Sequence, residues 1–321
     1  MRERLPFPFV VGCGRSGTTL VRAMLDAHPA LAIPDESYFA VWLGRNRSRY
    51  ERPEGFATAR FLDDVSDFEW FQHWGLEIAD VRAAFAANPP CTFADAVRTC
   101  FACYATAHGK PRYGDKTPIF VQHIPMLAEM FPEAVFVHVV RDGRDVVLSR
   151  IEASWGTERL DHEALQWRSH IEKGRSDGVA LGGRRYREVH YEDLLDDPER
   201  VARELCDFAA LDFDPAMLRY HERATPLVGT LAIPQEHQNL FRPPTKGLRD
   251  WREQLSPAQV ALFEELAGDT LEAFGYDRVT TAAPASVRAQ ALRARARYVS
   301  LTQYRRARGA VWRAVHPGVD A

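Results

Sequence analysis

The sequence predicts an α/β protein with a doubly wound parallel sheet, on three observations. First, a glycine-rich segment at residues 12–19 lies between an apolar run and a helical pattern. Second, short apolar runs typical of strands alternate with helical patterns from residue 7 to about residue 209, as in β-α-β units. Third, the run Val135–Val140 is apolar without alternation, which indicates a strand buried on both faces of a parallel sheet.

The chain opens with a strand at Phe7–Val11, a glycine loop, and a helix from Thr18 to about Ala27. Three glycines, Gly12, Gly14 and Gly17, allow a tight turn that aims backbone N–H groups inward, and the helix amino terminus adds its positive dipole end. This pattern predicts a phosphate cradle of the P-loop type, the alternative being a plain glycine-rich turn. Its spacing fits G-x-x-x-x-G, but Thr18 stands where nucleotide triphosphatases have lysine, and Arg15 supplies the cation.

A short second strand is expected at Ala30–Ile33, followed by the acidic pair Asp35 and Glu36. Residues 38–110 lack strong strand patterns and carry many aromatic residues, which predicts a mainly helical insertion. Such aromatic residues form either a pocket wall or ordinary core. The α/β pattern then resumes with these expected elements: strands near Arg112–Tyr113, at Val135–Val140 and at Tyr186–His190, and helices near Ile124–Met130 and Pro198–Ala209.

Polar segments directly follow several of these strands. They are residues 12–19, Asp35 with Glu36, Arg141 with Asp142, and Tyr191. Because ligands of doubly wound sheets bind at the carboxyl ends of the strands, we expect the fold to gather these residues at one edge of the sheet.

The last hundred residues differ in composition. Residues 225–250 are rich in proline, glycine and polar side chains, which predicts a long loop, and a helix is expected at Pro257–Phe274. Beyond Pro284, eight arginines lie between Arg288 and Arg313, against a single acidic residue, Asp320. This predicts a helix that contacts an acidic lipid or partner surface, or else a solvated helix or frayed end. We therefore expect one α/β domain over residues 1–283, with the insertion at 38–110, and an Arg-rich helical tail over residues 284–321.

Composition excludes several classes of protein. With 321 residues, 46% of them apolar, the chain can bury a large core, and a net charge of -3 argues against a general nucleic-acid binder. No apolar run approaches the roughly 18 residues that span a bilayer, and the first strand begins near residue 7. We therefore expect a cytoplasmic protein without signal peptide or transmembrane segment. The five cysteines include Cys100 and Cys103, which lack a second pair at zinc-finger spacing, so buried free thiols are expected.

The segment from Arg141 to Ser149 follows the buried strand and enters a helix. The arginine guanidinium offers a planar fork of donors to phosphate oxygens, and the serine hydroxyl, about two turns further on, adds a directional hydrogen bond. Taken alone, the segment favours a plainer interpretation, in which Arg141 pairs with Asp142 or Asp145 and Ser149 is an ordinary helical serine.

Three motifs together resemble the sulfotransferases that use 3′-phosphoadenosine-5′-phosphosulfate (PAPS) as donor and release the bisphosphate PAP. They are Gly-x-x-Arg-Ser-Gly-Thr-Thr at residues 12–19, Gly-Asp-Lys-Thr-Pro at 114–118 and Arg-Asp-Gly-Arg-x-x-x-x-Ser at 141–149, within a resemblance that runs from about Phe7 to Tyr276. The resemblance implies that the donor's 5′-phosphosulfate is bound by Gly14, Arg15, Ser16, Gly17, Thr18 and Thr19. It implies that the 3′-phosphate is bound by Arg141 and Ser149. Two looser matches are Tyr191, which is similar to the family's tyrosine near the nucleotide, and Lys246 with Gly247, which resemble the late loop that closes over the 3′-phosphate.

Within that family, the chain is most similar to the branch that contains protein-tyrosine sulfotransferases and many bacterial enzymes. Glu36 lies 21 residues after Arg15, at the interval where that branch has its general base. The histidine of the cytosolic branch is not found, because Pro118 stands two residues after Lys116. His123 is a weaker candidate that could also cap or pack. The resemblance thus implies Glu36 as base, with Lys116 and Arg15 stabilising the leaving oxygen without a metal ion.

Two other functions stay open. A P-loop phosphotransferase of the kinase type would use the same cradle, and Asp142 after the buried strand imitates a metal-binding aspartate, although Thr18 replaces the expected lysine. A non-catalytic nucleotide-binding module would keep the cradle, but it has no need of both Glu36 and Lys116. For a sulfotransferase, we expect the acceptor hydroxyl to belong to a small molecule or glycan rather than to a peptide, and we expect no nucleic-acid partner.

Overall fold

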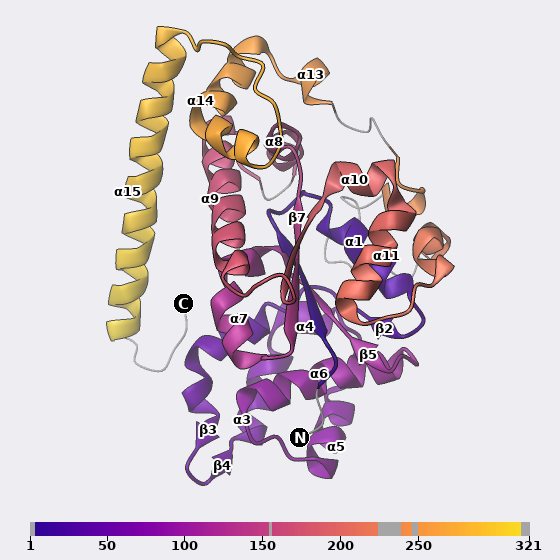
Figure 1. Ribbon diagram of the computed structural model, residues 1–321. Helices are drawn as coiled ribbons and strands as arrows, with labels where there is room; N and C mark the ends of the chain where they lie inside the picture. The colour runs from indigo at the N-terminus through magenta and orange to yellow at the C-terminus, as the bar shows by residue number, and fades with distance from the viewer. Residues whose placement is uncertain (1–3, 154–155, 224–238, 246–249, 316–321) are drawn as a thin grey trace. The chain divides into compact units, whose positions relative to one another are not determined.

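The computed structural model describes residues 4–153, 156–223, 239–245 and 250–315, and Figure 1 shows them coloured along the chain. They fall into two compact units. The first unit comprises residues 1–140 and 173–246, and the second comprises residues 141–172 and 247–321. Helix α9 (Leu160–Val179) contributes to both, because the division falls between residues 172 and 173.

The first unit is built on a four-stranded parallel sheet in the order β6-β1-β7-β8, and the predicted α/β class is confirmed. The strands are β1 (Phe7–Gly12), β6 (Asp115–Lys116), β7 (Ala134–Val140) and β8 (Tyr186–His190). Every residue of β1 and β7 is buried, as expected of central strands covered on both faces. The register pairs Val10 with Lys116 and Gly12 with Val139, so the segments after these strands leave from the same edge.

Two short strands depart from the prediction. β5 (Arg112–Tyr113) pairs in parallel with β2 (Leu31–Ala32) in a separate two-stranded sheet. The strand that joins the main sheet is instead β6, which the sequence analysis does not predict. Strands of two residues show no periodicity, so tertiary contacts of the neighbouring segments decide how they pair.

Alternate side chains of the central strands enter two hydrophobic cores, one on each face of the sheet. Phe9 and Phe136 belong to the core shared with the insertion, with the 3₁₀ helix η2 (Pro118–Gln122) and with α7 (Ile124–Met130). Val10 and Val137 belong to the other core. Helices cover this second core, namely α1 (Thr18–Ala27), α10 (Tyr191–Asp196), α11 (Pro198–Ala209) and the 3₁₀ helix η3 (Pro215–Arg223). In Figure 1, α1 and α11 lie on one side of β7 and α7 on the other.

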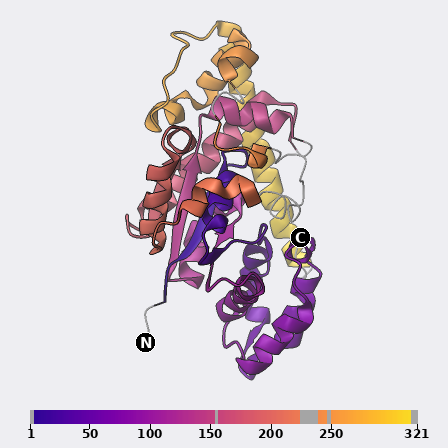
Figure 2. The same cartoon turned by 90° about the vertical axis from the view of Figure 1, so that its right-hand side faces the viewer.

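Residues 39–107 are mainly helical, and Figure 2 shows their purple helices gathered to one side of the sheet. Their elements are α2 (Phe39–Trp42), η1 (Gly44–Arg49), the hairpin β3 (Glu51–Arg52) and β4 (Gly55–Phe56), α3 (Thr58–Ser66), α4 (Glu69–Gln72), α5 (Ile78–Ala87) and α6 (Phe93–Ala107). Many of their aromatic rings are ordinary core, as Phe61 is among Tyr50, Phe85 and Phe93. All five cysteines are free, but Cys91, between α5 and α6, is exposed rather than buried.

The second unit is helical in its described residues. Its elements, besides the start of α9, are α8 (Gly143–Ile151), α13 (Trp251–Gln254), α14 (Pro257–Ala273) and α15 (Ala285–Val315). At its centre Arg144 is buried, paired at 2.7 Å with both Asp142 and Glu264, and lies 3.7 Å from the Trp251 ring centre. None of the described helices has both the length and the apolar character needed to cross a membrane.

Candidate active site

The glycine loop between β1 and α1 is shaped by close contacts of its backbone. At Gly12, an added Cβ would lie 2.6 Å from the Val139 carbonyl oxygen of the neighbouring strand. At Gly17, φ is +96° and an added Cβ would lie 2.3 Å from the ring of Tyr191, so this tyrosine packs directly on the loop. Arg15 also has a left-handed backbone, with φ 75°. Residues with side chains rarely adopt this conformation, which is typical of loops held in one shape for binding.

The loop offers donors to an anion. Gly17 precedes α1 without a capping side chain, and the first N–H groups of a helix, here at Thr18 and Thr19, have no acceptor within it. The Ser16 side chain is fully buried, and in the described part of the chain its Oγ has no hydrogen-bond partner. A buried hydroxyl left in this way costs about 1–3 kcal/mol. A phosphate oxygen that accepted its hydrogen bond would remove that cost, so the loop fits a phosphate group.

Lys116 and Glu36 meet at the carboxyl edge of the sheet. Lys116 ends β6, in register with Val10, two residues before the glycine loop begins at Gly12. Glu36 comes from the loop after β2. Lys116 Nζ donates to Glu36 Oε1 at 2.7 Å, and the two side chains are 2% and 15% exposed. The structure thus brings together, beside the glycine loop, the residues that the sequence analysis selects as cation and base.

Asp35 and Arg22 extend this charged cluster into the core. The Asp35 carboxylate lies 3.9 Å from both Lys116 Nζ and Arg22 Nη1, and all three side chains are buried. Arg22 belongs to α1 and also donates from Nε to the Ile33 carbonyl oxygen at 3.0 Å. Because a buried charge is tolerated only with a partner, these contacts hold the lysine in place. Sequence reasoning misses Arg22, which is a single polar residue within the apolar pattern of α1.

Hydrogen bonds among Asp115, Thr117 and Ser37 join the segments that carry Glu36 and Lys116. We call these three residues the Asp115 network. Ser37 Oγ and Thr117 Oγ1 both donate to Asp115 Oδ2, the latter at 3.2 Å, and Thr117 Oγ1 accepts from the Ser37 N–H at 2.8 Å. All three side chains are buried, and burial raises the pKa of Asp115 to about 7. The sequence shows Ser37 beside Glu36, and Asp115 and Thr117 beside Lys116, but it does not show that these residues form a network. It fixes the loop of the base against the strand of the cation.

Four half-buried rings contact one another, and the first of them along the chain, Tyr38, follows Glu36 by two residues. We call Tyr38, Trp42, Trp70 and His123 the aromatic wall. Tyr38 contacts Trp42 and Trp70 with ring centroids 5.5 and 4.8 Å apart, and Trp42 contacts His123 at 6.0 Å. Burial, and after it the charge of Glu36 and a hydrogen bond to its carboxylate, raise the pKa of Tyr38 far above its usual value. Tyr38 is therefore a neutral phenol that touches the Glu36 carboxylate, and the rings of Trp42 and Trp70 adjoin it.

His123 belongs to the aromatic wall. Its ring meets Trp42, and its Nε2 lies 3.3 Å from Nη2 of the exposed Arg45. Burial, and after it the charge of Arg45, lower the pKa of His123 to about 4, so the imidazole is neutral at pH 7. Glu36, not His123, contacts Lys116. The ring contact with Trp42 and the contact with Arg45 favour a packing role for His123.

The residues expected at the 3′-phosphate are described only in part. Arg141 precedes α8, and its Nη2 lies 3.6 Å from Asp145 Oδ2, one of the two ion pairs that the sequence allows. Ser149 is buried on α8. Lys246 and Gly247 lie outside the described residues. The nucleotide contacts of Arg141, Ser149, Tyr191, Lys246 and Gly247 stay predictions.

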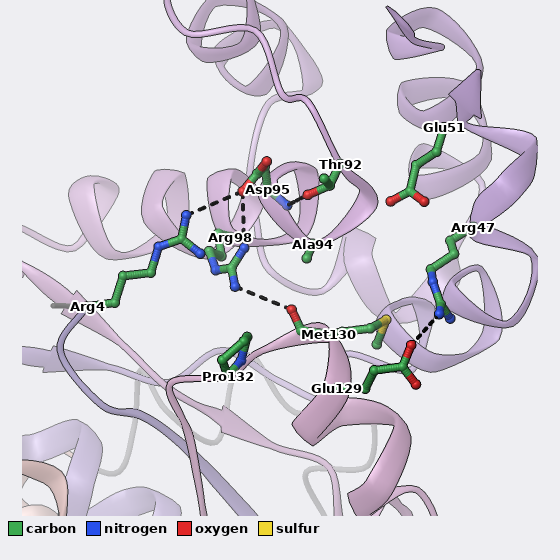
Figure 3. A pocket seen from close by; sticks show the side chains of 10 residues that line it. All are labelled: Arg4, Arg47, Glu51, Thr92, Ala94, Asp95, Arg98, Glu129, Met130 and Pro132. Atoms are coloured by element: carbon green, nitrogen blue, oxygen red, sulfur yellow. Dashed lines mark hydrogen bonds and ion pairs between the residues drawn. The ribbon is translucent and has the colours of Figure 1, made fainter. Parts of the chain in front are cut away.

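A pocket of about 350 Å³ lies at the other edge of the sheet (Figure 3). Its lining includes Arg4, which precedes β1, and Pro132, which precedes β7, so it lies at the amino ends of these strands. Its cations already have partners, since Arg98 and Arg4 contact Asp95 at 3.1 and 3.6 Å. Ligands of parallel α/β sheets bind at the carboxyl ends instead, and we take the Lys116–Glu36 edge as the candidate active site.

A glycine loop between β1 and α1, with a lysine–glutamate pair beside it at the carboxyl edge of a parallel sheet, defines a P-loop-type α/β protein. The sulfotransferase family model matches residues 6–215, and the chain belongs to the sulfotransferase family, as the motifs suggest.

Curated relatives agree with this assignment, and a solved structure shares the fold. Protein-tyrosine sulfotransferase A of Caenorhabditis elegans is 28% identical over 225 residues, which cover 68% of this chain and 53% of that protein. Protein-tyrosine sulfotransferase 1 of Danio rerio is 28% identical over 231 residues, which cover 68% of this chain and 57% of that protein. The match thus spans little more than half of these relatives. The sulfotransferase domain of the Synechococcus PCC 7002 olefin synthase has the same fold, with a TM-score of 0.58 and 24% identity, over 86% of this chain and 98% of that domain.

Proposed function

We propose that this protein transfers a sulfonate group from PAPS to the hydroxyl group of an acceptor and releases PAP. Membership of the sulfotransferase family supports the reaction class. The observation that carries the proposal is the 2.7 Å contact of Lys116 with Glu36 beside the glycine loop. A cation and a carboxylate at this point meet the two needs of the reaction, because charge develops on the leaving oxygen while the acceptor loses a proton.

The donor is held at its 5′ end by the glycine loop. Ser16 offers its buried hydroxyl to a phosphate oxygen, and the N–H groups of Thr18 and Thr19 point their dipoles at the same group. Arg15 adds charge, and Gly17 with Tyr191 packed on it closes the loop. In this proposal Gly14 contributes backbone donors, while Arg141, Ser149, Lys246 and Gly247 bind the 3′-phosphate.

The chemistry then follows from the charged pair. The acceptor oxygen forms a bond to sulfur as the bond from sulfur to the bridging oxygen breaks, and that oxygen takes the electron pair. Lys116 and Arg15 neutralise the charge on the bridging oxygen, a form of preorganised stabilisation that is usually the largest catalytic effect. Glu36 accepts the proton of the acceptor hydroxyl. Since Lys116 and Glu36 are paired before the donor is present, the lysine leaves the carboxylate for the bridging oxygen and so frees the base.

The proposal is tested with Glu36→Gln and a matched control, Glu133→Gln. Glu133 is also largely buried and pairs with Arg98 at 2.6 Å, but it lies just before the amino end of β7. With ³⁵S-labelled PAPS and a cell extract as the source of acceptors, we expect Glu36→Gln to lose about 10²- to 10⁴-fold in transfer rate. PAP should still raise its melting temperature, and the control should keep its activity. Normal transfer by Glu36→Gln removes Glu36 from the mechanism, and no transfer by the wild type removes the proposal.

The kinase-type alternative conflicts with the surroundings of Asp142. This residue caps α8, where its Oδ1 accepts from the Arg144 N–H at 2.9 Å. Its Oδ2 accepts from Arg144 Nη2 at 2.7 Å and from Trp251 Nε1 at 3.1 Å. Both oxygens are thus engaged within the second unit rather than arranged for a metal ion. A larger thermal shift with PAP than with ADP and Mg²⁺ excludes the kinase, and PAP binding without any transfer supports the non-catalytic module instead.

For the acceptor, we propose a small molecule or glycan. The aromatic wall supports a ring-bearing acceptor, because aromatic rings such as those of Trp42, Trp70 and Tyr38 are suited to packing against sugar or aryl rings. The curated relatives are named protein-tyrosine sulfotransferases, so a peptide tyrosine is the rival acceptor. Mass spectrometry of the labelled products separates the two. Cytoplasmic residence is proposed with this function and is checked by cell fractionation.

A further inference from the structure

Helix α15 carries positive charge that nothing along the helix neutralises. Eight arginines and no aspartate or glutamate lie within Ala285–Val315, in a chain whose net charge is -3. Several surface arginines elsewhere have acidic partners one turn away, as Arg200 has Glu204 at 2.8 Å and Arg203 has Glu199 at 2.7 Å. By contrast, the exposed arginines 288, 293 and 297 of α15 form no ion pair with any residue that the structure describes. Such a surface favours binding of an external polyanion.

One side of α15 is held by the second unit. The helix packs on α14, and Figure 1 shows the two side by side. Val287, Ala291 and Ala294 recur at helical spacing and are buried. The Arg295 guanidinium donates to the Glu265 carbonyl oxygen of α14, and the Tyr298 ring lies 5.6 Å from His162. The helix is therefore anchored along one side by the second unit, and among its described side chains those of Arg288, Leu292, Arg293, Arg297, Val299 and Tyr304, here called its open sides, are exposed.

Large apolar side chains alternate with the arginines on the open sides. Leu292 is 68% exposed, Val299 is 52% exposed and Tyr304 is 62% exposed. Leu292 and Val299 follow Arg288 by four and eleven residues, so the three share one stripe of the helix. Exposed leucine and valine side chains are not stabilised by contact with water. Their placement between cations is typical of helices that lie in the interface of a membrane.

We propose that the open sides of α15 bind the surface of an anionic phospholipid membrane. The arginines donate to lipid phosphates, while Leu292, Val299 and Tyr304 enter the boundary between headgroups and acyl chains. Nucleic acid would also attract the arginines, but it offers no apolar layer to leucine and valine, which favours lipid. This surface belongs to the second unit and is independent of the sulfonate transfer proposed above.

The full chain is tested by sedimentation with vesicles of phosphatidylcholine alone and with 30% phosphatidylglycerol. We expect binding only to the anionic vesicles, with loss of binding at high salt. The triple variant Arg288→Gln, Arg293→Gln, Arg297→Gln should bind roughly 100-fold more weakly, since each arginine near an anionic surface is worth about fivefold in affinity. The double variant Leu292→Ser, Val299→Ser should also weaken binding. Because it removes apolar contacts rather than charges, this loss should be seen at low and at high salt.

A matched control removes three exposed arginines of the first unit, at positions 200, 203 and 219. It changes the net charge equally, so we expect vesicle binding within twofold of the wild type. An equal loss in both triple variants shows an effect of net charge and overturns the assignment to α15. The proposal also fails when the wild type ignores anionic vesicles, or when it binds a DNA duplex and not the vesicles. Unchanged melting temperatures show that the variants fold.

Discussion

The Asp115 network makes the stability of the protein depend on pH in an unusual direction. Asp115 is fully buried, and burial raises its pKa from 3.8 to about 7. A carboxyl group with a raised pKa keeps its proton in the folded protein at pH values where the unfolded chain has lost it. The free energy of unfolding therefore falls as the pH rises from about 4 to 7. Below this interval Asp115 has no effect on stability, and above it the full penalty applies.

The perturbation is Asp115→Asn, which keeps the size of the side chain and cannot ionise. One pKa unit corresponds to about 1.4 kcal/mol, so the shift of Asp115 amounts to about 4 kcal/mol at most. At pH 4 the folded wild type and the variant are both neutral at this position. At pH 8 only the wild type carries the buried charge. We expect the variant to gain up to about 4 kcal/mol over the wild type between these two pH values.

The assay is urea unfolding of both proteins at half-unit steps from pH 4.5 to 8.5. A fixed cost of burying the new amide cancels, because the prediction concerns how the difference changes with pH. Ser37→Ala is a matched variant with a distinct outcome. The Ser37 hydroxyl lowers the pKa of Asp115, so its removal raises that pKa and extends the decline of stability to higher pH. A difference between wild type and Asp115→Asn that is the same at pH 5 and pH 8 refutes the reasoning.

Two further predictions concern single buried groups. Ser16→Ala removes the unpartnered hydroxyl, so we expect the melting temperature without nucleotide to be unchanged or higher. We expect the Kd for PAP, measured by calorimetry, to rise about tenfold. An unchanged Kd contradicts a contact with phosphate. His138 is fully buried with its Nδ1 2.7 Å from the Tyr186 hydroxyl, and burial lowers its pKa to about 4. The unfolded chain therefore takes up a proton first as the pH falls, and we expect stability to decrease by up to about 3 kcal/mol from pH 6.5 to 4. His138→Gln should abolish this contribution, so equal slopes in acid denaturation of the two proteins would speak against it.

The parts of the fold that sequence reasoning locates are those with local causes. The helices at 18–27 and 198–209 and the strand at 186–190 have the expected bounds, because the apolar pattern that marks each of them lies within the segment itself. The glycine loop is predictable for the same reason, since Gly12 and Gly17 are needed by the turn itself. The strands β2, β5 and β6 are too short for such signals, and the contacts of their neighbours decide their pairing.

The candidate site divides in the same way. The motifs identify Glu36 and Lys116 separately, but their contact joins residues 80 positions apart and depends on where β2 and β6 lie. Arg22 escapes sequence reasoning, because a buried arginine on an amphipathic helix is recognised only once Asp35 is seen 3.9 Å away. Asp115 escapes it as well, since an acidic residue beside a lysine is expected to pair with that lysine. In the structure the lysine turns to Glu36, and Asp115 serves two hydroxyls instead.

Alternation along an extended chain explains why the charged pair and the Asp115 network occur together. Successive side chains of a strand point to opposite sides, so Asp115 and Thr117 face one way and Lys116 the other. In the loop opposite, Glu36 meets Lys116, and the next residue, Ser37, meets Asp115 and Thr117. A shift of one residue that brought Ser37 opposite Lys116 would separate these partners and leave the lysine facing a serine. The Lys116–Glu36 pair and the Asp115 network are therefore formed by the same two short segments, Glu36-Ser37 and Asp115-Lys116-Thr117. A substitution in the network should disturb the positions of Glu36 and Lys116 although it changes neither residue.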